Sequence, residues 1–236
     1  MATEKIERVK LITPEFRASY PTVFTPRKPK DKENDPKAKA KYSIAMYFRV
    51  QETPESKAAG EVVADLKELK AEVAKVFLAK LGPDWANIIQ QKKGDGSPMY
   101  KVPFKNGAAD DCKVADPKAP GGFKWKPGMG PGVVVVRASS EYKPGVVDRN
   151  KAEILNPQDF QGGDYARAQV HAYWYDVSGN KGVTFGLDNV QMIRNGERFG
   201  GAGSAEDAFD AMPLPTDGVV GAGVAPSVAD PLAALG

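Results

Sequence analysis

YARAQVHAYWYDV, residues 165–177, shows the two-residue alternation of a β-strand whose two faces differ in chemistry. One face is small and apolar, as a protein core requires: Ala166, Ala168, Val170, Ala172 and Trp174. The other face is aromatic and polar: Tyr165, Arg167, Gln169, His171, Tyr173 and Tyr175. Rings beside a cation suit stacking of nucleobases, which tolerates any base. An aromatic ladder covered by another element would give the same pattern, so the strand alone leaves both interpretations open.

Further strands are predicted on both sides of this segment. Residues 42–50 alternate an apolar face with a face that carries Tyr47 and Arg49. Residues 7–24 indicate two short strands around Pro14, with unbroken alternation from Phe16 onward. Strands are also expected at 133–139 and 183–193, the latter joined to 165–177 by a short hairpin loop. The chain is therefore expected to be mainly β.

A single helix is predicted over residues 54–81. Thr53 can cap it, Pro54 suits its first turn, and Gly82-Pro83 ends it. Its apolar residues recur at spacings of three and four, a stripe that should pack against a barrel: Val62, Leu66, Leu69, Val73 and Val76. The glycine-rich stretch 84–130 is predicted to be an inserted connector.

Composition excludes several classes of protein and site. The 24 glycines and 19 prolines among 236 residues favour β structure over a helical bundle. No apolar run is long enough for a signal core or a membrane span, so we expect a soluble protein without membrane contact. One cysteine, Cys112, and one histidine, His171, cannot form an intrachain disulfide or the usual zinc site. No phosphate-cradling loop or catalytic set is visible, so neither an enzyme nor a cofactor is predicted.

Charge is unevenly distributed along the chain. Residues 200–236 hold five acidic and no basic side chains, which leaves 33 basic and 25 acidic ones in residues 1–199, a net charge of +8. Seven of these bases lie in the segment 25–41, a predicted solvated loop. A basic body suggests a polyanionic ligand, and the tail, predicted to be disordered, could compete with that ligand or recruit proteins.

These features predict a set of contacts to single-stranded nucleic acid. The stacking rings would be Tyr47, Tyr173 and Tyr175, and the phosphate contacts would be arginines and lysines. Trp125 with Lys124 forms a second aromatic and basic cluster, for which anchoring of the connector is an equal alternative. The predicted cationic contacts are Arg27, Lys28, Lys30, Lys37, Lys39, Lys41, Arg49, Lys124 and Arg167.

Several segments together resemble a family of phage-encoded single-stranded-DNA-binding proteins. The resemblance rests on KYSIAMYF at 41–48, KPGVVDRN at 143–150, DFQGGDYARAQVHAYWYD at 159–176 and NKGVTFGLDNVQMIRNGERFGG at 180–201. It implies an open β-barrel of the OB type over residues 1–199, with the helix and the connector as insertions. It also implies binding of single strands during phage replication or recombination, in the cytoplasm of a bacterial host.

Two other functions stay open at this point: a strand-annealing recombination factor, and a structural or inhibitory phage protein that binds no DNA. A homodimer is compatible with the sequence, which does not give the oligomeric state. Members of such families often end in acidic residues and an aromatic, whereas this sequence ends VADPLAALG. Recruitment of replication or recombination proteins would then fall to AEDAFD at 205–210.

Overall fold

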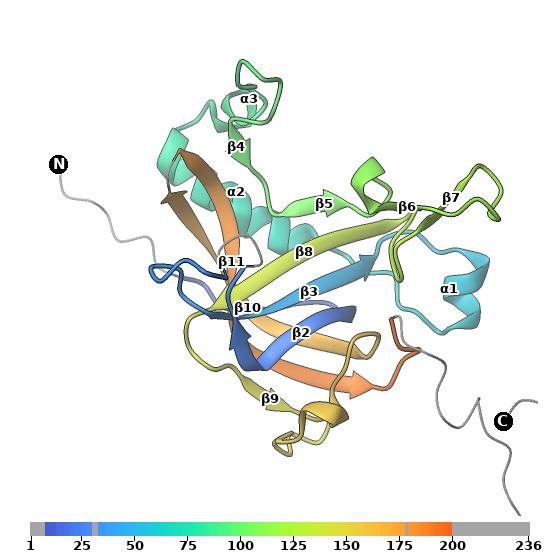
Figure 1. Ribbon diagram of the computed structural model, residues 1–236. Helices are drawn as coiled ribbons and strands as arrows, with labels where there is room; N and C mark the ends of the chain where they lie inside the picture. The colour runs from blue at the N-terminus through green and yellow to red at the C-terminus, as the bar shows by residue number, and fades with distance from the viewer. Residues whose placement is uncertain (1–7, 30–32, 178, 200–236) are drawn as a thin grey trace, which may run out of the picture. The chain divides into compact units, whose positions relative to one another are not determined.

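The computed structural model describes residues 8–29, 33–177 and 179–199. Short and long strands account for most of the regular structure (Figure 1). The strands are β1 Leu11–Ile12, β2 Phe16–Arg27, β3 Lys41–Arg49, β4 Tyr100–Lys101, β5 Phe104–Asn106, β6 Lys113–Ala115, β7 Phe123–Trp125, β8 Val133–Ser140, β9 Gly145–Val147, β10 Tyr165–Val177 and β11 Asn180–Arg194. The helices are α1 Pro54–Ala58, α2 Lys67–Leu81, α3 Trp85–Ile88 and the 3-10 turns Asp110–Cys112 and Pro157–Asp159.

Five long strands pair in a closed order. β2 pairs with β3, β3 with β8, β8 with β11, β11 with β10, and β10 returns to β2. The β8–β11 pair is parallel and the other four are antiparallel. This ring is the five-stranded barrel of the OB type. The predicted fold class is therefore confirmed.

The inner face of the barrel follows the predicted alternation on β3 and β10. Ile44, Met46 and Phe48 on β3 are buried, and so are the alanines and Val170 on β10. β2 departs from the prediction, because its register with β3 shifts between Ser19 and Thr22. Within this shift Tyr20, with a φ of 45°, is exposed, and beyond it Val23 is buried, so the unbroken alternation predicted there is wrong.

The predicted helix 54–81 is two helices. α1 begins at the Thr53 cap as expected, but it ends at Ala58 and α2 begins only at Lys67. Gly60 takes a φ of 62°, which ends α1, and the Ala64 amide then donates to the carbonyl of Arg49 on β3. Four members of the predicted stripe are buried as expected, whereas Val62, between the helices, is exposed.

α2 packs against β10 and β11. Its Phe77 ring stacks on Trp85 of α3 and meets Trp174 of β10 edge to face, at centroid distances of 5.9 and 6.2 Å. The apolar stripe of the helix is thus joined to the barrel core, as the sequence predicted.

The connector 84–130 contributes to the sheet, contrary to its interpretation as a plain insertion. β5 pairs with β8, and β4 pairs in parallel with the start of β11. Figure 1 shows β5, β8, β3 and β2 side by side, with the β6–β7 hairpin beyond β5. Strands of two or three residues carry almost no periodic signal, which is why the sequence did not reveal them.

Some predictions concern residues outside the described ranges. The acidic tail 200–236, predicted to be disordered, and the predicted contact Lys30 lie there. Over the described ranges, no helix combines the length and the apolar character needed to cross a bilayer.

Candidate nucleic-acid interface

A groove of about 630 Å³ runs over the outer face of the barrel where β8, β11 and β10 meet. β8 contributes Arg137 to it, and β10 contributes Tyr173 and Tyr175. β4, β5 and the residues between them form one wall, with Lys101 and Lys105, and Lys41 lies at the start of β3. The residues that line the groove include four cations and two tyrosines, and none of them is acidic.

The four cations differ in their partners. Lys41 approaches Glu141 at 3.7 Å, and Lys105 pairs with Asp111. Among the described residues, no carboxylate lies within 4.0 Å of the charged groups of Lys101 or Arg137. Both are exposed, so they are the cations most open to an anionic ligand.

The two tyrosines are half-buried along one edge of the groove. Burial raises the pKa of the Tyr173 phenol, and nearby Arg8 acts in the opposite direction. Burial likewise raises the pKa of the Tyr175 phenol, with a smaller contribution from Tyr173. Both rings therefore stay neutral at physiological pH and add no negative charge beside the cations.

A glycine on β11 lets the basic wall lie close to the barrel. A Cβ atom at Gly182 would stand only 2.2 Å from the carbonyl oxygen of Lys101. The pairing of β4 with β11 thus depends on the missing side chain, and this pairing places Lys101 at the groove.

The sequence pointed to Lys41, Tyr173 and Tyr175 of the groove and missed Lys101, Lys105 and Arg137. Arg137 was within reach of sequence reasoning, because it lies on the polar side of the predicted strand 133–139. Lys101 and Lys105 were not, because only long-range pairing of the short strands β4 and β5 brings them there.

Tyr47 was predicted to present an open ring, and this is wrong. Its side chain is 6% exposed, in a small cluster with Val133, Val135 and Met129. The Phe199 ring covers it at a centroid distance of 5.6 Å. Residues that are 152 positions apart in the chain thus form this contact, which no local pattern could indicate.

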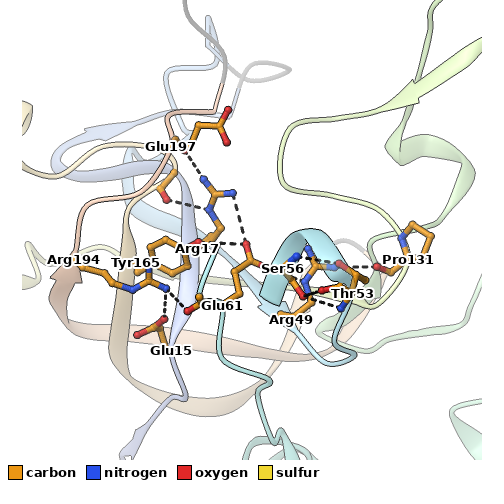
Figure 2. A network of polar contacts seen from close by, with 12 residues as sticks. Glu15, Arg17, Arg49, Thr53, Ser56, Glu61, Pro131, Tyr165, Arg194 and Glu197 are labelled. Carbon is orange, nitrogen blue, oxygen red and sulfur yellow. Dashed lines mark hydrogen bonds and ion pairs between the residues drawn. The ribbon is translucent and has the colours of Figure 1, made fainter. Parts of the chain in front are cut away.

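Arg49 was predicted to contact phosphate but is held within the protein (Figure 2). Its Nε donates to Glu61 Oε2 at 2.8 Å, and its guanidinium also donates to the Pro131 carbonyl at 3.1 Å. Glu61 also lies 3.7 Å from Arg17 and accepts from the Tyr165 hydroxyl at 3.4 Å. Tyr165, predicted to share the open face of its strand, is buried in this network.

The remaining predicted contacts lie apart from the groove lining. Arg167 lines a different recess and donates to Gln191 at 2.7 Å. Lys124 pairs with Asp116, and Trp125 meets Phe123 of the same strand β7 edge to face at 5.4 Å. The predicted cations of the loop before β3 are all exposed: Arg27, Lys28, Lys37 and Lys39. Two of them have partners within the protein, because Lys28 donates to the Asp35 carbonyl and Lys39 pairs with Glu141.

Comparison with known proteins shows the family of the chain. The family model described as the ssDNA-binding protein of Enterobacter phage Enc34 matches residues 9–219. The chain belongs to this family. Membership confirms the resemblance to phage single-stranded-DNA-binding proteins that the sequence indicated.

Individual relatives are more distant. "Putative protein p50" of Acyrthosiphon pisum secondary endosymbiont phage 1 is 38% identical over 86 residues, which are 35% of this chain and 46% of that protein. The alignment thus spans about half the length of this relative. Among solved structures, the single-stranded DNA-binding protein from bacteriophage Enc34, C-terminally truncated, has a TM-score of 0.50 at 16% identity, covering 80% of this chain and 88% of that one. Gp2.5, a single-stranded DNA-binding protein encoded by bacteriophage T7, has a TM-score of 0.46 at 13% identity, covering 92% of this chain and 100% of that one.

Proposed function

We propose that this chain binds single-stranded DNA in the groove formed by β8, β10, β11 and the β4–β5 wall. The observation that carries the proposal is the composition of the groove lining: four cations and two neutral tyrosines without an acidic residue. Membership of a single-stranded-DNA-binding family supports the choice of ligand.

The groove would hold a strand by two different interactions. The phosphates would be neutralised by the four cations of the groove, Lys41, Lys101, Lys105 and Arg137, and this interaction does not depend on the base sequence. Tyr173 and Tyr175 lie two residues apart on one face of β10 and would stack on bases, which every base permits. Binding would therefore tolerate most sequences, as coating of single strands during phage replication or recombination requires.

No catalytic step is part of the proposal. Cys112 is buried, and His171 is paired with Asp188. The protein would act as a binding protein inside the bacterial host, and its tail 200–236 would compete with DNA or recruit partner proteins.

The number of groove cations sets the expected salt dependence. Neutralisation of about four phosphates on a single strand gives a slope of roughly −3 for log K against log salt concentration. Titration of a fluorescent oligo-dT at several salt concentrations measures this slope. Arg137→Ala should make it shallower by about 0.7, because one phosphate contact is lost.

A duplex of matched length serves as the comparison in the same assay. The groove is expected to favour the single strand, because a duplex hides the base faces that the two tyrosines would stack on. Equal affinity for both, or a slope near zero, would contradict the proposal.

A further inference from the structure

A second recess, of about 360 Å³, adjoins the groove. Lys41 and Tyr173 line both cavities. The recess continues from them over the end of β8 and the middle of β11, where Tyr142, His171 and Asp188 complete its wall. A strand lying in the groove would therefore pass its opening.

The polar groups of the recess differ from those of the groove. Two carboxylates, Asp188 and Glu141, line it together with two cations, Arg8 and Lys41, whereas no carboxylate lines the groove. Glu141 is engaged by Lys39 at 2.9 Å and by Lys41 at 3.7 Å. Asp188 Oδ2 lies 3.0 Å from His171 Nδ1, whereas its Oδ1 has no hydrogen-bond partner among the described side chains and backbone. The recess thus offers a hydrogen-bond acceptor, held in position, next to a phosphate-binding groove.

Aromatic rings bound the same space. The His171 ring lies over Gly186, where a Cβ atom would be 2.3 Å from its Cε1, and its centroid is 5.8 Å from that of Tyr173. The Tyr142 side chain is 85% exposed, and its backbone N–H donates to Ser140 Oγ at 3.0 Å, which fixes the turn that carries it. An exposed ring at the edge of a polar recess is suited to covering a flat, partly polar ligand.

We propose that this recess receives one nucleobase of the bound strand, with Tyr142 stacked on it and Asp188 accepting a hydrogen bond from an exocyclic amino group. The inference rests on the proposed function and adds a base preference to it. Cytosine offers its N4 amino group to a carboxylate. Thymine has a carbonyl oxygen at the same position, and the Asp188 carboxylate repels it. Binding in the recess therefore favours cytosine over thymine, whereas the groove itself does not distinguish between the two bases.

The ratio of affinities for oligo-dC and oligo-dT of equal length tests the preference. At about pH 8, where cytosine is neutral, the wild-type protein should bind oligo-dC about threefold to tenfold more tightly, the effect of one hydrogen bond to a charged group in a partly hydrated site. Asp188→Asn should remove the preference and bring the ratio to one or below, because the Asn oxygen accepts from His171 and its NH2 group then donates toward the base, where thymine O4 can accept. This variant keeps an oxygen for the contact with His171. Its lost negative charge strengthens the binding of both oligomers alike, and the ratio is unaffected by that change.

Two matched controls separate the recess from general effects. Asp176→Asn makes the same change of charge at an exposed position of β10 that lines neither cavity, and it should leave the ratio at the wild-type value. Tyr142→Ala should weaken binding of both oligomers by about fivefold or more, because a stack is lost. Tyr20→Ala should not, although Tyr20 is 84% exposed, because it lines neither cavity.

The outcomes distinguish the recess from the groove. An unchanged ratio in Asp188→Asn, or equal effects of the two tyrosine substitutions, overturns the base recess while binding in the groove stands. Failure of the wild-type protein to bind either oligomer overturns the proposed function as well.

Discussion

Replacing Tyr173 and Tyr175 together by alanine is expected to weaken binding of single-stranded DNA by about 2–4 kcal/mol, roughly 30-fold to 1,000-fold. Each stack of a base on an aromatic ring contributes about 1–3 kcal/mol, and two neighbouring stacks on one strand give less than their sum. Both rings line the groove from β10, and neither belongs to the core cluster of the barrel. Fluorescence titration with oligo-dT measures the loss.

Conversion of both residues to phenylalanine is the matched control, because it keeps the rings and removes only the hydroxyl groups. This variant should bind within about twofold of the wild-type protein, since stacking needs only the ring faces. Thermal melts of both variants accompany the titrations. Undiminished binding by the alanine variant would show that the rings do not stack on bases, and a collapse of its melting temperature would place them in the core.

Substitution of Glu61 by glutamine is expected to lower the free energy of unfolding by about 3 kcal/mol. The Glu61 side chain is only 8% exposed and contacts Arg17 of β2, Arg49 of β3 and Tyr165 of β10 (Figure 2). The substitution removes the negative charge of Glu61 and leaves the guanidinium groups of Arg17 and Arg49 without their carboxylate partner. The side chains of these arginines are only 16% and 19% exposed. For a domain of this size, the melting temperature should fall by roughly 6–12 °C.

Glu52→Gln provides the comparison for this effect. Glu52 pairs with Lys57 at 3.7 Å, with side chains that are 59% and 74% exposed, and a surface pair of this kind contributes about 0–1 kcal/mol. DNA binding by Glu61→Gln, measured well below its melting temperature, should stay close to that of the wild-type protein, because Glu61 lies outside the groove lining. Equal melting temperatures for the two glutamine variants would refute the stabilising role of the Glu61 network.

The barrel could be predicted from the sequence because the alternation of apolar residues along its long strands indicates which face of each strand is buried. On β3 the residues Ile44, Met46 and Phe48 are buried in the core, and on β10 the alanines and Val170 are, so the two-residue period predicts the inner face of the barrel. It does not predict the outer face, where Tyr47 and Tyr165 are buried as well. The bulge on β2 and the break between α1 and α2 could not be predicted in this way. Both depend on backbone conformations, at Tyr20 and Gly60, that tertiary contacts help to stabilise.

The groove was predictable only where it is built from long strands. Tyr173 and Tyr175 followed from the alternation on β10, whereas Lys101 reaches the groove through the close approach of β4 to Gly182. The opposite error occurred at Tyr47. Alternation placed its ring on an outer face, and Phe199 from the end of the described chain then covered that face. A local pattern reports the face of a sheet, but it cannot report what packs on that face from a distant segment.

Charge reversal in the groove tests the central claim most directly. The double variant Lys101→Glu, Arg137→Glu should bind oligo-dT at least about tenfold more weakly at about 0.15 M salt, where the Debye length is about 8 Å, because two phosphate contacts become repulsive. Lys70→Glu, Lys80→Glu makes the same change of net charge on exposed positions of α2, which do not line the groove. We expect the α2 variant to bind within about twofold of the wild-type protein, since screening weakens distant charges. If both variants lose affinity equally, or if the groove variant binds as the wild-type protein does, the strand does not lie in this groove.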